Sequence, residues 1–170
     1  MKNSFSSRIF VLLAFMSASL VSWAGTSTNQ ANGILQIEAE IFRQSETNII
    51  LNIAVKNIGS KDVLIPNGYL PWDRYAMSLV LVGTDPASTP LQQELVIADP
   101  MPGDPWKLKK GDSLKGNIDL TDRFPQLPKV LKHTEVIVFW SYQLEAEEEM
   151  KFDRIAGWKV IPKLTSPSPK

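Results

Sequence analysis

The feature that most constrains the fold is an alternating apolar run in the first half of the chain. Four apolar residues occupy every second position of this run: Ile49, Leu51, Ile53 and Val55. An extended strand buries all four on one face. The turn-forming residues 57–62 follow, and then comes Val63–Ile65, a second strand-like run that Pro66 ends because proline cannot donate to a ladder. The segment Leu51–Pro66 therefore predicts two short strands joined by a polar turn.

Similar strand-like runs recur about every ten residues along the rest of the chain. They cover residues 34–42, 77–82, 91–98 (a weaker pattern), 113–120, 135–143 and 155–161. The run 34–42 is expected to form a hairpin with the opening strand or to face it. Asn67-Gly68 predicts a turn, and Thr121-Asp122 predicts the cap of one short helical turn. The run 135–143 is apolar on both faces, which predicts a strand in the centre of a sheet. The pattern predicts an all-β protein, an antiparallel immunoglobulin-like β-sandwich of seven to eight strands. An eight-stranded β-barrel is the alternative, and the variable, proline-rich connections favour the sandwich.

The N-terminus has the features of an export signal. Lys2 and Arg8 precede an apolar run, Ile9–Val21, and Ser22 and Ala24 supply the small residues of a cleavage site. An uncleaved membrane anchor is the alternative, although the run is short for a spanning helix. We therefore expect a signal peptide at 1–24, a flexible segment at 25–33, a β-sandwich domain at 34–163 and a disordered tail at 164–170. The expected location is the periplasm or the medium, with no membrane span after cleavage.

Two turn motifs resemble those of small exported immunoglobulin-like domains of bacteria. The first lies in Ile49–Ile65, where VKNIGSKDVLIP has an early strand–turn–strand of the form v-N-x-G-x-x-x-v. The second lies in Leu108–Tyr142, where LKKGDSLKGNIDL precedes the strand EVIVFWSY. The layout resembles the intracellular proteinase inhibitor family of bacilli and the N-terminal segments of some deuterolysin-type metalloproteases. The resemblance implies an immunoglobulin-like fold and inhibition or protein binding, and it carries over no functional residue.

The composition narrows the range of partners. The chain has 18 basic and 18 acidic residues, without a basic stripe, which argues against nucleic acid and anionic membranes. It contains no cysteine and a single histidine, His133, so the sequence excludes a zinc site on ligand count. A calcium site at Asp99, Asp104 and Asp112 is the remaining metal possibility, and a plain proline-rich turn is the favoured interpretation. We expect no metal and no cofactor.

The sequence offers little for catalysis. His133 lies in a turn before the strand 135–143, and the chain has no Gly-x-Ser-x-Gly elbow that would supply a nucleophile to this base. A hydrolase is therefore a distant alternative, and we expect no catalytic residue and no enzymatic activity. The run of four glutamates within 145–149 is interpreted as a solvated hairpin tip.

The remaining candidates are aromatic and charged residues in predicted loops. They are Trp72, Asp73, Arg74, Tyr75 and Trp106. Loops on a sandwich scaffold form binding sites, and Trp, Tyr and Arg dominate interface energetics. The favoured interpretation of Trp72 and Trp106 is nevertheless that they cover the ends of the core. Trp140 and Trp158, which lie within strands, are interpreted as core or sheet-face residues.

Two functions are compatible with these observations. The first is an exported binding or inhibitory module that contacts another envelope or secreted protein through the loops. The second is a structural, assembly or chaperone role in which a sheet edge, Val63–Ile65 or Ile34–Phe42, pairs with a partner strand.

Overall fold

The computed structural model describes residues 30–31, 33–74, 76–94, 103–144 and 152–164. These residues form nine strands and two short helices. The strands are β1 (Gln30–Ala31), β2 (Leu35–Ser45), β3 (Asn48–Asn57), β4 (Val63–Ile65), β5 (Met77–Gly83), β6 (Trp106–Leu108), β7 (Ser113–Asp119), β8 (Val136–Tyr142) and β9 (Ile155–Ile161). The helices are α1 (Leu120–Arg123) and α2 (Leu127–Leu131). Every pairing between neighbouring strands is antiparallel, and the chain is an all-β sandwich as predicted.

The first sheet has the strand order β1-β2-β3-β7. Strands β2 and β3 form the predicted hairpin, with Ile37 opposite Val55 and a register shift between Arg43 and Ser45. Strand β3 lies between β2 and β7, so it has no free edge to offer a partner. Gln30 and Ala31 were expected in a flexible segment, but they form β1 and pair with β2.

The second large sheet has the order β5-β8-β9, with β8 in the centre as predicted. Although this strand is apolar on both faces, only one of its faces is buried. Val136, Val138 and Trp140 are buried, whereas Phe139 on the other face is 44% exposed. No other layer covers this face among the described residues, so an apolar residue there meets solvent.

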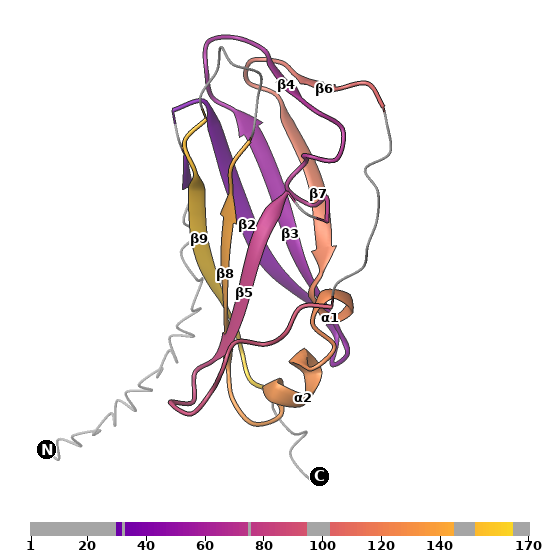
Figure 1. Ribbon diagram of the computed structural model, residues 1–170, viewed down its shortest axis with the longest axis vertical. Helices are drawn as coiled ribbons and strands as arrows, with labels where there is room; N and C mark the ends of the chain where they lie inside the picture. Colours follow the sequence, from indigo (N-terminus) through magenta and orange to yellow (C-terminus); the bar gives the residue numbers. More distant parts are fainter. Residues whose placement is uncertain (1–29, 32, 75, 95–102, 145–151, 165–170) are drawn as a thin grey trace, which may run out of the picture.

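A two-stranded ribbon, β4 with β6, lies at one end of the molecule, opposite the helices (Figure 1). The turn after β3 carries the chain out of the first sheet into this ribbon. Trp106, expected in an irregular proline-rich loop, begins β6 and pairs with Ile65. Strand β6 pairs with β4 along its whole length, so one side of the predicted edge Val63–Ile65 is already taken by a neighbouring strand.

The core lies between the two large sheets. Ile49, Leu51, Ile53 and Val55 are all at most 2% exposed, which confirms the inward face that the alternation predicted. They belong to the same buried cluster as Val136, Val138 and Trp140 of β8. Burial of each such side chain stabilises the fold by about 1.5–3 kcal/mol. The three sheets stay separate in the described part of the chain, so the alternative of a closed barrel does not apply.

The two helices connect β7 to β8. The carboxylate of Asp119 caps α1 by accepting from the N–H groups of Thr121 (2.9 Å) and Asp122 (3.0 Å), so the cap precedes the predicted Thr121-Asp122. Pro128 lies in the first turn of α2, where its missing N–H costs nothing. Leu164, expected in the tail, donates its N–H to the Leu131 carbonyl and packs against the core.

Several sequence expectations concern segments outside the described residues. These are the predicted signal peptide, most of the weak strand 91–98, the glutamate run 145–149 and most of the tail. Of the weak strand, Leu91 donates its N–H to the Leu81 carbonyl, and residues 91–94 are not in a strand. In the part of the chain that the structure describes, no helix is long and apolar enough to cross a membrane.

Candidate binding site

The residues singled out as binding candidates lie mostly in loop 66–76, which connects β4 to β5. The loop begins with a turn in which Tyr69 donates its N–H to the Pro66 carbonyl (3.1 Å). Gly68 has φ +83° in this turn, a conformation that favours glycine. The predicted Asn67-Gly68 turn is thus confirmed. Loop 66–76 then closes the side of the sandwich between the edge strands β7 and β5.

Trp72 points into the molecule. Its indole lies against Gly116 of β7, and a Cβ atom on Gly116 would be only 2.1 Å from Trp72 Cδ2. The side chain is partly buried and packs against the core cluster. Trp72 therefore covers the open side of the core, as the favoured interpretation predicted.

Asp73 and Arg74 make contacts within the protein. The Asp73 carboxylate accepts from the Leu70 N–H (2.8 Å), and the Asp73 N–H donates to the Leu70 carbonyl (2.8 Å). Arg74 Nη2 donates to the Glu94 carbonyl (3.4 Å). Both side chains are half-buried, and Tyr75 lies outside the described residues. The structure thus gives Asp73 a role in shaping the turn.

Arg123, a residue that the sequence analysis missed, holds this loop from inside. It is 6% exposed, and its guanidinium donates to the carbonyls of Trp72 (3.0 Å), Arg74 (3.3 Å) and Asp73 (3.5 Å). Burial, and then the positive charge of Arg74, lowers the pKa of Arg123. The group nevertheless stays charged at neutral pH because arginine ionises far above that range. The loop carbonyls and the nearby negative charges of Asp122 and Asp73 offset this buried charge.

Tyr142 anchors the beginning of the loop. Its side chain is 1% exposed, and its hydroxyl donates to the Tyr69 carbonyl (2.8 Å). Burial, and then the negative charge of Asp73, raises the pKa of Tyr142. Together Tyr142 and Arg123 fix the backbone from Tyr69 to Arg74. For Tyr142 the sequence signal is a hydroxyl at an inward position of an otherwise apolar strand, whereas Arg123 follows Thr121 and Asp122 and has no such signal.

The exposed apolar residues of this region are Leu64, Tyr69 and Trp106, and we call Tyr69 and Trp106 the ribbon site. Leu64 lies opposite Lys107 and Trp106 lies opposite Ile65, so Leu64 and Trp106 are on opposite faces of the ribbon, and Tyr69 lies four residues after the end of β4. Their exposed fractions are 52% for Leu64, 38% for Tyr69 and 49% for Trp106. Of the five predicted binding residues, only Trp106 is thus strongly exposed among those the structure describes.

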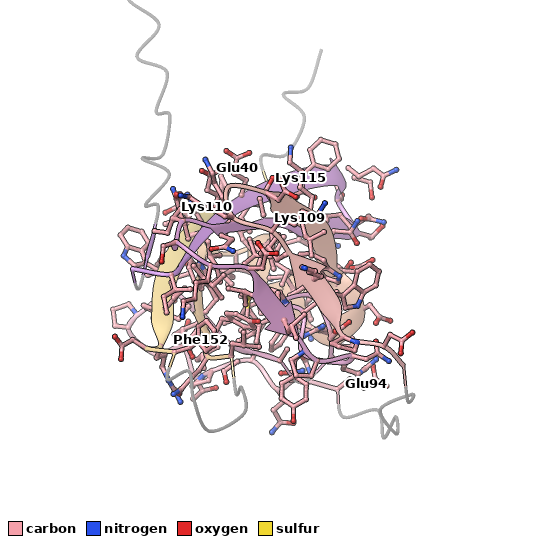
Figure 2. All side chains as sticks on the ribbon, turned by 90° about the horizontal axis from the view of Figure 1, so that it is seen from above. Glu40, Glu94, Lys109, Lys110, Lys115 and Phe152 are labelled. Atoms are coloured by element: carbon pink, nitrogen blue, oxygen red, sulfur yellow. The ribbon has the colours of Figure 1, made fainter. Side chains whose placement is uncertain are left out.

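Charged side chains surround the ribbon site. Lys107 forms an ion pair with Asp62 (3.1 Å), whose other carboxylate oxygen accepts from the Lys110 N–H (3.1 Å). The hydrogen bond from Lys110, and then that from Lys107, lowers the pKa of Asp62. Lys61, Lys109 and Lys110 are also exposed. Figure 2, which is seen from this end, shows Lys109 and Lys110 on the side of the first sheet.

Asn57 ties the ribbon to the first sheet. The side chain is fully buried; its Nδ2 donates to the carbonyls of Lys61 (2.8 Å) and Leu108 (3.0 Å), and its Oδ1 accepts from the Gly59 N–H (3.0 Å). The Asn57 backbone also bonds to Gly111 (2.9 Å) and Asp112 (3.0 Å). This one residue therefore fixes both predicted turn motifs, N-x-G and K-K-G-D. The resemblance noted from those motifs is one of turn structure.

The other candidate sites receive no support from the structure. His133 is exposed in the turn after α2, as predicted. Among the described residues no group of three or more His, Asp or Glu side chains is placed to hold a metal ion. Asp99, one of the three aspartates considered for calcium, lies outside the described residues.

Comparison with known proteins yields a distant structural likeness only. No protein-family model matches the sequence, and no curated protein matches it. Among solved structures, the chain is similar to the GAE domain of GGA2p from Saccharomyces cerevisiae, with 19% identity and a TM-score of 0.32 over 79% of this chain and 97% of that one. It is also similar to a yeast GGA1 GAE domain (GGA1_GAE domain-P21), with 16% identity and a TM-score of 0.29 over 79% of this chain and 96% of that one. At these TM-scores the function has to be derived from the residues of this chain.

Proposed function

We propose that this protein is a non-enzymatic, exported binding module that contacts another protein through the ribbon site. The observation that carries the proposal is the exposure of Trp106 and Tyr69 beside a backbone held by buried anchors. Tryptophan and tyrosine contribute most to interface energies when a partner covers them. Because Tyr142 and Arg123 already order the adjacent loop, binding costs less conformational entropy.

The charges around the site favour a particular partner chemistry. Lys61, Lys109 and Lys110 are exposed in and near the ribbon, and Asp62 is already paired with Lys107. The exposed Asp104 and Asp112 leave the unpaired basic residues in excess by one. A partner segment with an apolar side chain flanked by acidic residues therefore fits best. Such a contact weakens as salt screens the charges.

The test is partner capture from the envelope fraction of the source organism. We expect the wild-type protein to retain a specific protein and the Tyr69→Ala/Trp106→Ala variant to lose it. Phe42→Ala is the matched control, because Phe42 is 53% exposed on a different surface and its loss leaves the ribbon site intact. Equal capture by the Tyr69→Ala/Trp106→Ala variant, or no specific capture by the wild type, contradicts the proposal.

The assembly role through a sheet edge is not favoured by any observation. The edge Val63–Ile65 spans three residues and already pairs with β6 along its length. Strand β2 pairs with β3 along one side and with β1 near its start, which covers part of the second predicted edge. The hydrolase alternative rests on His133, which lies exposed in its turn.

A further inference from the structure

The turn at the start of loop 66–76 exposes one asparagine to attack by the residue that follows it. Asn67 precedes Gly68, which has no side chain to keep its main-chain nitrogen away from the side-chain carbonyl carbon of Asn67. The hydrogen bond from the Tyr69 N–H to the Pro66 carbonyl closes the turn without using the Gly68 N–H. In the described part of the chain the Gly68 N–H donates to no acceptor. The attacking nitrogen is therefore not held in a hydrogen bond.

The other asparagines among the described residues lack these features. Each lies in a strand and precedes an isoleucine, whose branched side chain hinders approach to the main-chain nitrogen; they are Asn48, Asn52 and Asn57 in β3 and Asn117 in β7. A second Asn-Gly pair occurs at 32–33, and its asparagine lies outside the described residues. Within the described ranges, Asn67 is thus the asparagine most open to attack.

We propose that Asn67 is a site of spontaneous deamidation, and that this modification inactivates the ribbon site as the protein ages. The Gly68 nitrogen forms a bond to the side-chain carbonyl carbon of Asn67, and the side-chain amide leaves as ammonia together with the proton of that nitrogen. Water then opens the five-membered succinimide ring at either of its carbonyls, which gives aspartate or isoaspartate. The inactivation rests on the proposed function, whereas the chemical step does not.

Asn67 is close to both segments that carry the ribbon site. It is two positions before Tyr69 in the chain, and its side-chain amide lies against Gly103, three positions before Trp106. A Cβ atom on Gly103 would be only 2.7 Å from Asn67 Nδ2, so the amide occupies the space beside this glycine. A chemical change at Asn67 therefore affects the surroundings of both aromatic residues.

Both products alter this region. Each adds a carboxylate next to Gly103, and the exposed Asp104 already places one negative charge beside that glycine. A partner segment with acidic residues is then repelled. In isoaspartate the main chain also runs through the former side chain, which lengthens the backbone by one carbon atom. The ring closed by the hydrogen bond from Tyr69 to Pro66 is enlarged, so the turn loses its geometry.

The first test is peptide mapping of the purified protein after incubation at mildly alkaline pH, where the attacking nitrogen loses its proton more readily. We expect the peptide that contains Asn67 to gain the mass of an amide-to-acid conversion and to contain isoaspartate. The peptides that contain Asn52 and Asn117 are internal controls and are expected to remain unchanged. An Asn67 peptide that changes no faster than these controls overturns the proposal. Aspartate without isoaspartate also overturns it, because direct hydrolysis by water gives aspartate alone.

Hydrogen exchange tests the structural effect without any partner. The Tyr69 N–H is expected to exchange faster in the isoaspartate form than in fresh protein. The Leu91 N–H, which donates to the Leu81 carbonyl in another part of the fold, is the control and should exchange at the same rate in both. Equal exchange of Tyr69 in the two forms contradicts the loss of the turn.

The effect on binding is tested by partner capture with fresh and aged protein. Aged wild type is expected to lose most of the capture that fresh wild type shows. Asn67→Gln, whose longer side chain does not readily close the five-membered ring, should capture equally before and after ageing. Equal capture by fresh and aged wild type, or an equal loss in aged Asn67→Gln, contradicts the inactivation. If fresh wild type captures nothing, the proposed function fails and the inactivation fails with it, while the peptide map still decides the chemical step.

Discussion

Trp72 lies against Gly116, and this contact closes the side of the sandwich between β7 and β5. Because Gly116 has no side chain, there is room beside it for the indole of Trp72, which is 44 positions earlier in the chain. A Cβ atom at Gly116 would collide with the ring, so this contact requires glycine. Trp72 therefore serves to pack the core.

Gly116→Ala is expected to destabilise the protein by about 1–3 kcal/mol, because the added methyl group overpacks against the ring. Chemical denaturation measures the effect. Lys115→Ala, the exposed neighbour on the opposite face, serves as control and is expected to change the free energy of unfolding by less than about 0.5 kcal/mol. In a Trp72→Ala background the cost of Gly116→Ala should largely disappear, and two fully additive effects would contradict the contact.

Asn57→Ala is expected to cost about 2–3 kcal/mol, because it leaves the carbonyls of Lys61 and Leu108 without their side-chain donor in a buried site. Asn52→Ala, in the same strand with an exposed side chain, is the matched control. Thermal unfolding of the two variants checks the difference. Similar melting temperatures would show that Asn57 does not hold the two turns together.

Arg123→Met is expected to free the backbone of residues 72–74 while keeping much of the side-chain volume. Hydrogen exchange should then accelerate in this loop, because the carbonyls lose a charged donor that contributes about 1.5–3 kcal/mol per bond. Arg123→Lys should restore only part of the protection, since an ammonium lacks the planar fork. Arg154→Met, at an exposed position, is expected to leave the exchange of the loop unchanged.

Tyr142→Phe is expected to alter the alkaline limb of the stability profile. Because the folded-state pKa of Tyr142 is raised above its unfolded value, the unfolded chain loses this proton first. The stability contributed is present below about pH 10 and is lost as the pH rises above that value. The free energy of unfolding, measured from pH 8 to 11, should fall less steeply for Tyr142→Phe than for the wild type. At pH 8 the variant should be less stable than the wild type by about 1 kcal/mol, because the hydrogen bond to Tyr69 is lost. Tyr69→Phe, with its exposed side chain, should decline like the wild type.

The fold was predictable where alternation alone determines which face is buried. Leu51 and Ile53 point inward as their spacing requires, and β2 and β3 form the expected hairpin. Strand β8 shows the limit of this reasoning, because Phe139 faces outward although its apolar side chain suggests burial. Local sequence does not record whether another layer covers a sheet, so a residue that meets solvent or a partner looks like a core residue.

The candidate site was less predictable because it depends on contacts between distant segments. Trp72 and Trp106 look alike in sequence, but only Trp72 has a glycine beneath it. Arg123 follows two polar residues in a short helix, and nothing nearby marks it as the residue that binds three carbonyls about fifty positions earlier. Such a role arises only when the chain folds and brings the distant segments together.

Arg123 and Tyr142 bind loop 66–76 only through main-chain oxygens. These hydrogen bonds do not depend on which side chains the loop exposes to solvent. Substitutions at its outward positions can therefore change what the protein recognises without loosening the loop, provided that Gly68 and the Trp72–Gly116 contact remain. This loop is accordingly a natural place to graft a new specificity, by evolution or by design.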